Sequence, residues 1–383
     1  MLGDDEPLVG TEDSKETMKQ WLLQWFEKYA KNICLGSRER IAQADKPATT
    51  KNQEEAKGDE VTYGKYKWMT YQQVKEYSIA LGKYIIKEDI CPEVEEQKSV
   101  HWQADINSQK HRFMGIYSGN REEWMLTYLA CVFSNIVTVS LYTALSDDGI
   151  DFIVQQTQLS TIALERNKID HILKLKEQGM LKSLWNLLCF DEPTDEEIQK
   201  CNEQGISIFY ILECAKRGDE LDIELEDPSY DSMVTINYTS GTTGTPKGVV
   251  VTHRCYMSKI LSGKHNYLEI FETDCHYSYL PLAHCFENTV EMAMLSSGAS
   301  IGYFSGNLLK IIEDVQTLQP TIFAAVPRIL NRLRDKITSG INEQTGLKRR
   351  LIDMAIKTKM ENVARNGQNT HMIYDRLIFN KIK

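Results

Sequence analysis

The sequence predicts an α/β fold with mostly parallel sheets flanked by helices. From Phe113 onward, short apolar segments alternate with longer amphipathic ones, which is typical of βαβ units. Such alternation indicates a mostly parallel sheet that is covered by helices. The chain has 383 residues, which is too long for one average domain and favours two or three packed units.

The alternating region gives a predicted order of strands and helices. Strands are predicted at Phe113–Ser118, Val137–Leu141, Ser160–Leu164, Trp185–Phe190, Ile206–Ile211, Met233–Tyr238, His276–Leu280, Ala299–Phe304 and Thr321–Val326. Helices are predicted at Glu123–Phe133, Gly149–Gln156, Lys168–Glu177, Leu308–Leu318 and Pro327–Ile337. Pro327 suits a first helical position, because its missing N–H has no helical partner there.

The residues before this region have a different character. Met18–Cys34 places aromatic and leucine side chains on one helical face. Gln43–Glu60 is rich in Lys, Glu, Ala and Thr, so residues 1–62 are predicted to form a helix followed by a solvated loop. Gln73–Lys87 again has a helical pattern, and Ser99–Arg112 is expected to be a polar surface insertion.

The overall charge and the cysteines narrow the class of protein. The formal net charge of -10 argues against nucleic acid as the main partner, because phosphate binding needs a basic face. ATP remains compatible, since it needs only a few local donors. The nine cysteines include no CxxC pair and no zinc spacing, so we expect reduced, buried thiols in an intracellular protein.

One uncharged stretch, Trp124–Ser146, is long enough to cross a bilayer. Ser134-Asn135 interrupts it, and its second half is β-branched and alternating. We therefore expect a buried helix followed by a buried strand, with a membrane span as the alternative. Met1–Thr11 lacks the basic start and apolar run of a secretory signal.

The segment richest in chemistry is the glycine- and threonine-rich stretch that follows the predicted strand Met233–Tyr238. Its candidate phosphate-binding residues are Thr239, Ser240, Gly241, Thr242, Thr243, Gly244, Thr245, Pro246, Lys247 and Gly248. The glycines allow tight turns whose successive N–H groups can hold anionic oxygens. The hydroxyls add donors, and Lys247 adds a mobile positive charge. A flexible linker is the alternative, but a linker would not lie between two apolar strands.

This segment is not a Walker A loop, because Pro246 precedes the lysine and no Gly-Lys-Ser/Thr opens a helix. Tyr-Thr-Ser-Gly-Thr-Thr-Gly-x-Pro-Lys-Gly resembles instead the signature phosphate loop of the adenylate-forming superfamily. Within that superfamily the chain is most similar to the long-chain fatty acid–CoA ligases, from about Met18 to Lys383. The segments that carry this second resemblance are Tyr63–Tyr71, Gly115–Trp124, Tyr279–Glu287 and Val326–Leu333.

The resemblance implies a two-step reaction and roles for particular residues. A fatty acid would react with ATP, with Mg²⁺ as the metal, and coenzyme A would then take the acyl group. Thr239–Gly248 would hold the β- and γ-phosphates, with Lys247 compensating charge and Thr239 helping to hold Mg²⁺. His284 would lie beside the acyl carboxylate and reorient between the two half-reactions, and Phe286 would line the acyl channel. His253 is expected to be structural, and we predict no metal site beyond Mg²⁺.

The resemblance also implies a domain organisation. Residues 63–383 would form the large AMP-binding domain, and the family's later adenine, ribose and catalytic-lysine segments are not in this sequence. We therefore expect the N-terminal part of such a ligase, without the small C-terminal domain and inactive by itself in making acyl-CoA. A ligase of this kind would be cytoplasmic or peripheral on an endomembrane. The alternatives are adenylation of a different carboxylic acid, or a non-catalytic chain that binds nucleotide or lipid.

Overall fold

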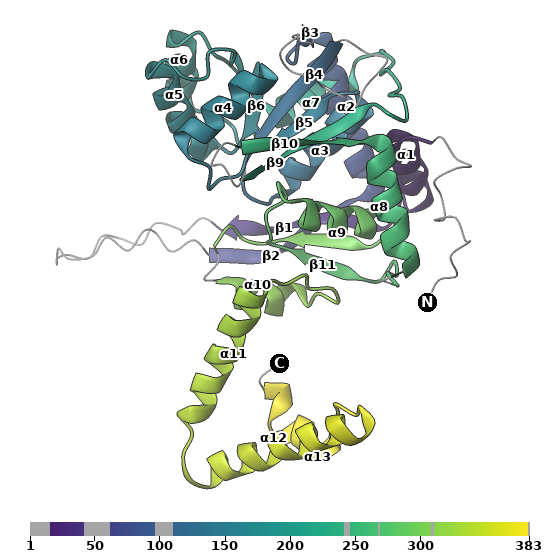
Figure 1. Ribbon diagram of the computed structural model, residues 1–383, viewed down its shortest axis with the longest axis vertical. Helices are drawn as coiled ribbons and strands as arrows, with labels where there is room; N and C mark the ends of the chain where they lie inside the picture. The colour runs from purple at the N-terminus through teal and green to yellow at the C-terminus, as the bar shows by residue number, and fades with distance from the viewer. Residues whose placement is uncertain are drawn as a thin grey trace, which may run out of the picture. The chain divides into compact units, whose positions relative to one another are not determined.

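The computed structural model describes residues 16–41, 62–95, 110–240, 246–266, 269–307 and 310–381. The chain divides into two compact units, residues 1–324 and 325–383. In its described residues, the first unit contains two sheets with the helices that pack on them, and the second contains helices alone (Figure 1).

The larger sheet of the first unit has the strand order β10-β9-β5-β4-β6-β7-β8, with β3 paired to β4. Its strands are β3 (Glu93–Glu95), β4 (Lys110–Tyr117), β5 (Val137–Ser140), β6 (Thr161–Leu164), β7 (Asn186–Cys189), β8 (Ser207–Tyr210), β9 (Met233–Ser240) and β10 (Pro246–Thr252). All pairings among β4 to β9 are parallel, and β10 and β3 pair antiparallel with their neighbours. The predicted mostly parallel sheet is therefore confirmed.

Helices cover both faces of this sheet. They are α2 (Tyr71–Lys87), α3 (Glu122–Phe133), α4 (Asp147–Thr157), α5 (Ile169–Glu177), α6 (Asp195–Glu203) and α7 (Ile211–Asp219). Successive residues of β4 point to opposite faces, so Phe113 joins the core under α4 and α5, whereas Met114 joins the core with α2 and α3. The sheet thus separates two apolar cores.

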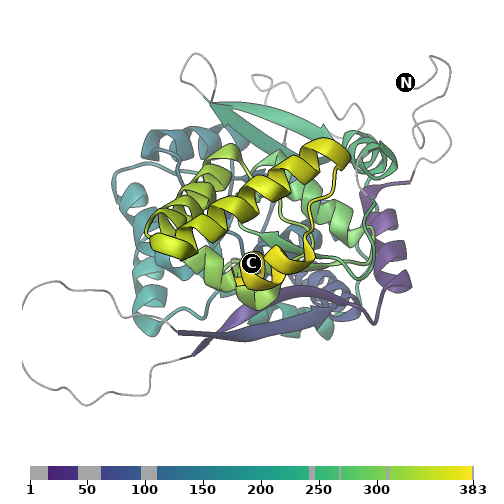
Figure 2. The same cartoon turned by 90° about the horizontal axis from the view of Figure 1, so that it is seen from below.

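The smaller sheet has the strand order β11-β12-β1-β2. Its strands are β1 (Ile33–Ile41), β2 (Thr62–Thr70), β11 (Cys275–Ser278) and β12 (Ser300–Tyr303), flanked in sequence by α1 (Met18–Lys28), α8 (His253–Asn266), α9 (Cys285–Leu295) and α10 (Ile311–Leu318). β1 and β2 form a long antiparallel pair (Figure 2), and β1 also pairs in parallel with β12. One continuous core contains side chains of both sheets together with α1, α2, α3 and α9, so these helices form the layer between the sheets.

The uncharged stretch is a buried helix followed by a buried strand, as predicted. Every side chain of α3 from Trp124 to Phe133 is buried, and so is all of β5. Among the described residues, no helix combines the length and the apolar character that a membrane span requires.

Three local predictions were wrong. The helix predicted over Met18–Cys34 ends at Lys28, because the chain turns and Ile33 begins β1, where Cys34 and Leu35 are buried in the sheet. Residues 110–112 of the predicted insertion belong to β4, since β3 pairs with them. Thr321–Val326 forms a single bridge, Ile322 to His276, because no continuous ladder extends along the edge of β11. The predictions for 43–60 and 99–109 lie outside the described residues.

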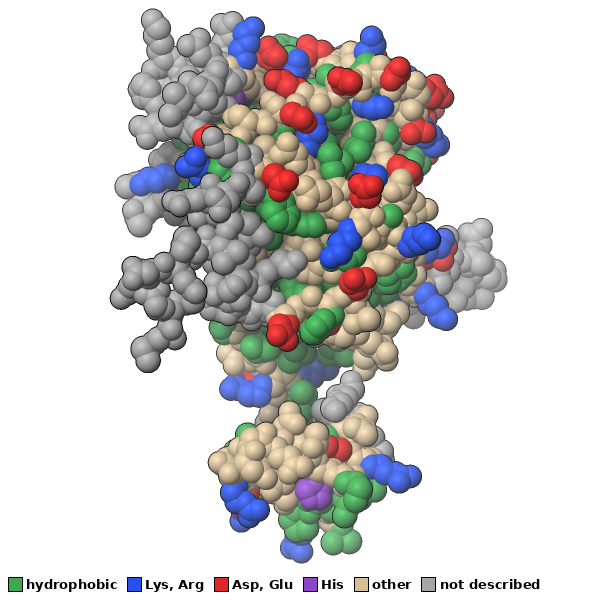
Figure 3. All heavy atoms as spheres, turned by 90° about the vertical axis from the view of Figure 1, so that its right-hand side faces the viewer, with side chains coloured by type: hydrophobic (Ala, Val, Ile, Leu, Met, Phe, Trp, Pro, Cys, Tyr) green, Lys and Arg blue, Asp and Glu red, His purple; other side chains and the backbone are tan. Residues whose placement is uncertain are grey.

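Most thiols are buried as predicted, but Cys255 and Cys285 are exposed and Cys275 is half-buried. Cys255 and Cys285 lie in the first turns of α8 and α9, on the sides of these helices that face outward. On the face shown in Figure 3, acidic and basic side chains of the first unit are interspersed rather than segregated.

The second unit consists of α11 (Pro327–Asn342), α12 (Gly346–Asn366), α13 (Met372–Leu377) and a 3₁₀ turn at Phe379–Lys381. Its small core contains Ile352, Ala355 and Ile378. Pro327 is the first residue of α11, as predicted.

Candidate active site

The candidate phosphate loop is the tip of the β9–β10 hairpin. Lys247 pairs with Thr239 and Gly248 with Tyr238, so both ends of the glycine- and threonine-rich segment are strand. Gly241, Thr242, Thr243, Gly244 and Thr245, which connect the two strands, lie outside the described residues. The hairpin follows the carboxyl end of β9, next to β5, and open parallel sheets bind ligands at this edge.

Gly248 is required by close packing inside the hairpin. A Cβ atom there would lie 2.9 Å from Cγ2 of Ile236 and 3.2 Å from Cζ of Tyr238. Tyr238 is buried, and its hydroxyl donates to Oε1 of Gln156 on α4 at 2.6 Å. This hydrogen bond therefore fixes the β9–β10 hairpin against α4.

Thr239 and Lys247 present exposed side chains at the same register of the hairpin. The Thr239 hydroxyl donates to the Lys247 carbonyl at 3.5 Å, which is long for a hydrogen bond. Both groups are thus accessible to a ligand that approaches the hairpin. No hydrogen bond or ion pair joins either of them to His284 within the described residues.

His284 is the N-cap residue of α9. Its Nδ1 accepts the backbone N–H of Phe286 at 3.1 Å, so the neutral ring carries its proton on Nε2. Across the described part of the chain, Nε2 has no hydrogen-bond partner. Phe286 lies in the same first turn and is 47% exposed. The structure therefore brings together the polar and the apolar residue that were predicted to contact an acyl group.

Asn120 was missed as a site residue, although it lies in the Gly115–Trp124 segment that resembles the ligases. It follows β4 and is buried. Its Nδ2 donates to Oγ of Ser278 at 2.8 Å and to the Leu280 carbonyl at 2.5 Å, and its Oδ1 accepts the Leu282 N–H at 3.0 Å. Asn120 thus fixes the chain that leads from β11 to His284. An asparagine within the turn between a predicted strand and a predicted helix was the available signal.

A cleft of about 460 Å³ adjoins Asn120 at the carboxyl edges of both sheets. Its walls include Arg38, Arg121, Glu122, Thr143, Asp191 and Ser305. Arg121 is held by charged hydrogen bonds to Glu123 and Asp191, at 2.6 to 3.0 Å. Burial, and next the negative charge of Glu123, raise the pKa of Glu122 to about 7.

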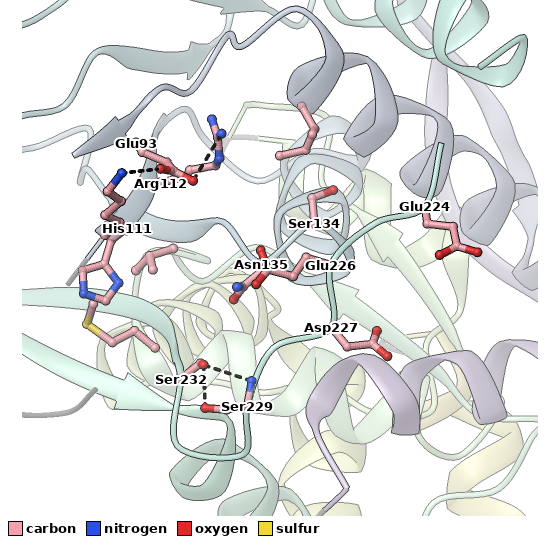
Figure 4. Close-up of a pocket in the computed structure, with 14 residues that line it drawn as sticks. Glu93, His111, Arg112, Ser134, Asn135, Glu224, Glu226, Asp227, Ser229 and Ser232 are labelled. Carbon is pink, nitrogen blue, oxygen red and sulfur yellow. Dashed lines mark hydrogen bonds and ion pairs between the residues drawn. The ribbon is translucent and has the colours of Figure 1, made fainter. Parts of the chain in front are cut away.

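A second pocket, of about 430 Å³, lies at the amino ends of β4, β5 and β9 (Figure 4). Figure 4 shows Glu93 facing Arg112, and these side chains form an ion pair at 3.6 Å. The pocket also contains Glu224, Glu226 and Asp227, so charges of both signs line it. This pocket lies at the amino end of β9 and the candidate phosphate loop follows its carboxyl end, so the pocket is not part of the candidate active site.

His253 has the structural role that was expected. It is buried at the start of α8, and its Nδ1 accepts the N–H of Met18 at 3.2 Å. Burial lowers the pKa of His253 to about 4, so the ring is neutral at physiological pH.

Solved structures share this fold. The adenylation domain of a carboxylate reductase from Mycobacterium chelonae matches with a TM-score of 0.74 at 17% identity, covering 93% of this chain and 53% of that one. The A domain of a carboxylic acid reductase from Segniliparus rugosus, in complex with AMP, matches with a TM-score of 0.67 at 18% identity, covering 92% and 55%. The fold is that of the adenylation domains of the adenylate-forming superfamily.

Sequence comparison defines the family. The profile of the AMP-binding enzyme family matches residues 103–360, and the chain belongs to that family. It is 30% identical to long-chain-fatty-acid–CoA ligase 1 of Cavia porcellus and of Homo sapiens, covering 100% of this chain and 50% of each relative. It is also 30% identical to the peroxisomal long chain acyl-CoA synthetase 7 of Arabidopsis thaliana, covering 99% and 48%. The chain thus spans about half the length of these relatives.

Proposed function

We propose that this protein activates a long-chain fatty acid with ATP and transfers the acyl group to coenzyme A. The observation that carries the proposal is the hairpin that presents Thr239 and Lys247 at the carboxyl edge of the sheet. The similarity to long-chain-fatty-acid–CoA ligases along the whole chain supports a long-chain fatty acid as the substrate and coenzyme A as the acyl acceptor.

The hairpin would bind the triphosphate of ATP. Backbone N–H groups and threonine hydroxyls of Thr239–Gly248 would donate to phosphate oxygens, and the Lys247 ammonium group would offset the charge that shifts as pyrophosphate leaves. Within the described residues, no group of three or more His, Cys, Asp or Glu side chains could hold a metal. Mg²⁺ needs few protein ligands, because phosphate oxygens and water supply most of its ligands. The hydroxyl of Thr239 could be its one protein ligand, and the metal would neutralise charge on the phosphate groups.

His284 and Phe286 would position the acid. The Nε2–H of His284 can donate to one carboxylate oxygen and leave the other free to attack the α-phosphorus of ATP. The new bond joins that oxygen to phosphorus, and the bond to pyrophosphate breaks. The thiol of coenzyme A then attacks the acyl carbonyl, and AMP leaves with the oxygen that came from the acid.

Exchange of labelled pyrophosphate into ATP tests the first step. The protein expressed from its complete coding sequence, and residues 1–383 alone, would be assayed with palmitate, octanoate and benzoate. Exchange that depends on palmitate supports the proposal, and exchange only with benzoate or octanoate assigns a different acid. Nucleotide binding without exchange for any acid, in the complete protein, would leave a non-catalytic binding role and overturn the proposal.

A further inference from the structure

A buried pair joins α9 to β11 directly beneath His284. Nε2 of His276, on β11, lies 2.8 Å from Oε1 of Glu287, and both side chains are fully buried. Nδ1 of His276 lies 3.3 Å from the carbonyl of Ile322. Both neighbours are oxygen acceptors, so each ring nitrogen of His276 faces an oxygen atom.

A second carboxyl group, that of Glu291, lies one helical turn further along α9 and is also fully buried. Its Oε2 accepts the hydroxyl of Tyr303, on β12, at 3.0 Å. Burial, and next the charge of Glu287, raise the pKa of Glu291 well above its usual range. Glu291 thus binds Tyr303 on β12 and interacts with Ser278 on β11, whereas Glu287 binds His276.

Stability does not explain these carboxyl groups. Oε2 of Glu287 and Oε1 of Glu291 have no hydrogen-bond partner in the described part of the chain. Burying such atoms destabilises a fold relative to apolar side chains of the same size. A buried ionic pair can instead fix the register of two elements, and here those elements are β11 and α9.

The position of Glu287 links that register to the candidate site. Glu287 is the third residue after the N-cap His284, so both belong to the first turn of α9. After Ser278, the last residue of β11, the chain runs to His284 and into the first turn of α9. The hydrogen bond between His276 and Glu287 joins the two ends of this connecting segment. Any rotation of the first turn relative to β11 must therefore break this bond.

We propose that Glu287 and His276 are positioning residues that hold His284 toward the acyl carboxylate during the first step, the attack on ATP. They act through the register of the first turn of α9 and do not touch the substrate. This inference rests on the proposed function, because it assigns the pair a role in the same reaction.

A double-mutant cycle tests the proposal in the protein expressed from its complete coding sequence. Glu287→Leu is expected to lower the palmitate-dependent exchange rate roughly 10- to 100-fold, the effect of a small misplacement of a reacting group. In a His284→Ala background the same substitution should change the rate less than about twofold, because the residue it positions is gone. Equal fold losses in both backgrounds would overturn the proposal.

Two further variants keep the test independent of folding. Glu287→Gln still offers His276 an oxygen acceptor and should recover most of the rate lost in Glu287→Leu. Glu291→Leu, the matched control one turn away, should alter the melting temperature but not the rate. Coupling between Glu291 and His284 as large as that of Glu287 would mean general destabilisation and would contradict the proposal.

A readout without substrate separates this inference from the proposed function. The ring ¹⁵N shifts of His284, assigned by comparison with His284→Ala, should show Nδ1 as acceptor and a protonated Nε2 in the wild type. In Glu287→Leu the ¹⁵N shifts of Nδ1 and Nε2 of His284 should move toward each other, toward a common average value. Unchanged shifts in a folded Glu287→Leu would overturn the positioning role, even if exchange is found. Averaged shifts without exchange for any acid would overturn the proposed function alone.

Discussion

Oδ1 of Asn120 accepts the backbone N–H of Leu282 at 3.0 Å, across 162 residues of sequence. The same side chain donates to Ser278 and Leu280, so one amide fixes the end of β11 and the chain that reaches His284. This contact joins two of the four segments that resemble the ligases outside the phosphate loop, Gly115–Trp124 and Tyr279–Glu287. It is a physical reason for the two segments to lie side by side.

Asn120→Ala should lower both stability and activity. It leaves the Leu282 N–H unpaired in a buried place, so the free energy of unfolding should fall by about 2–3 kcal/mol. The palmitate-dependent exchange rate should fall more than stability alone predicts, because the path to His284 loosens. Asn186→Ala is the control: Asn186, on β7, donates through Nδ2 to the carbonyl of Ile90, between α2 and β3, and its loss should affect stability only. Equal activity losses in both variants would contradict this account.

Lys247→Met should remove activity without changing stability. The side chain is exposed and has no ion pair in the described residues, so the melting temperature should stay within the range of surface substitutions. Loss of the positive charge beside the triphosphate should lower the exchange rate roughly 100-fold. Lys174→Met, on the exposed face of α5, is the matched control and should be fully active. A Lys247 variant with wild-type exchange would remove this residue from the site.

Gly248→Ala should distort the hairpin. The new Cβ would meet Ile236 and the Tyr238 ring at contact distances that side chains do not tolerate, which should cost about 1–3 kcal/mol of stability. The displaced strand should also weaken ATP binding, measured by calorimetry. Gly340→Ala provides the contrast: a Cβ there meets open space within α11, so the variant should be slightly more stable than the wild type.

His253 should make the protein sensitive to acid. Its folded pKa of about 4 lies below the unfolded value near 6.5, so the unfolded state binds more protons between these values. The stabilisation is fully present above pH 6.5 and is lost as pH falls toward 4, by about 2–3 kcal/mol. Urea unfolding of wild type and His253→Gln across this range should show a smaller slope in the variant. Parallel curves would show that His253 does not contribute.

Glu122 should have the opposite dependence. Its folded pKa of about 7 lies above the unfolded value near 4.5, so the folded state binds more protons in this window and loses stability as pH rises. Because the side chain is partly solvated, Glu122→Gln should be more stable than the wild type by only about 1–2 kcal/mol at pH 8. The difference should vanish near pH 4.5. A difference that persists there would mean that a lost hydrogen bond, not titration, separates the two proteins.

The sequence predicted the parallel sheet well because its strands are short, apolar and separated by clear helices, as β5, β6 and β7 show. It failed where partners far along the chain decide the structure. Ile33–Ile41 becomes a strand because β12 and β2 pair with it, and helical periodicity gave no sign of them. Thr321–Val326 has the composition of a strand, yet only Ile322 makes a bridge, and the Phe323 ring stacks on Tyr279 instead.

The site was predicted unevenly for the same reason. Thr239, Lys247 and Gly248 lie in one continuous motif, so they could be proposed as site residues from the sequence alone. Asn120 and His276 act through residues that are distant in sequence, and nothing in their immediate neighbours indicates those contacts. In the sequence, Glu287 was noted only as the last residue of a segment that resembles the ligases. Its full burial depends on the packing of α9 against the smaller sheet, which the sequence did not indicate.

The most direct test of the central claim follows one oxygen atom. The protein expressed from its complete coding sequence would be incubated with ATP, Mg²⁺, coenzyme A and palmitate labelled with ¹⁸O in both carboxylate oxygens, and the AMP analysed by mass spectrometry. Attack of the carboxylate on the α-phosphorus predicts one ¹⁸O in each AMP. Unlabelled AMP, or label found in inorganic phosphate, would contradict activation through acyl-AMP.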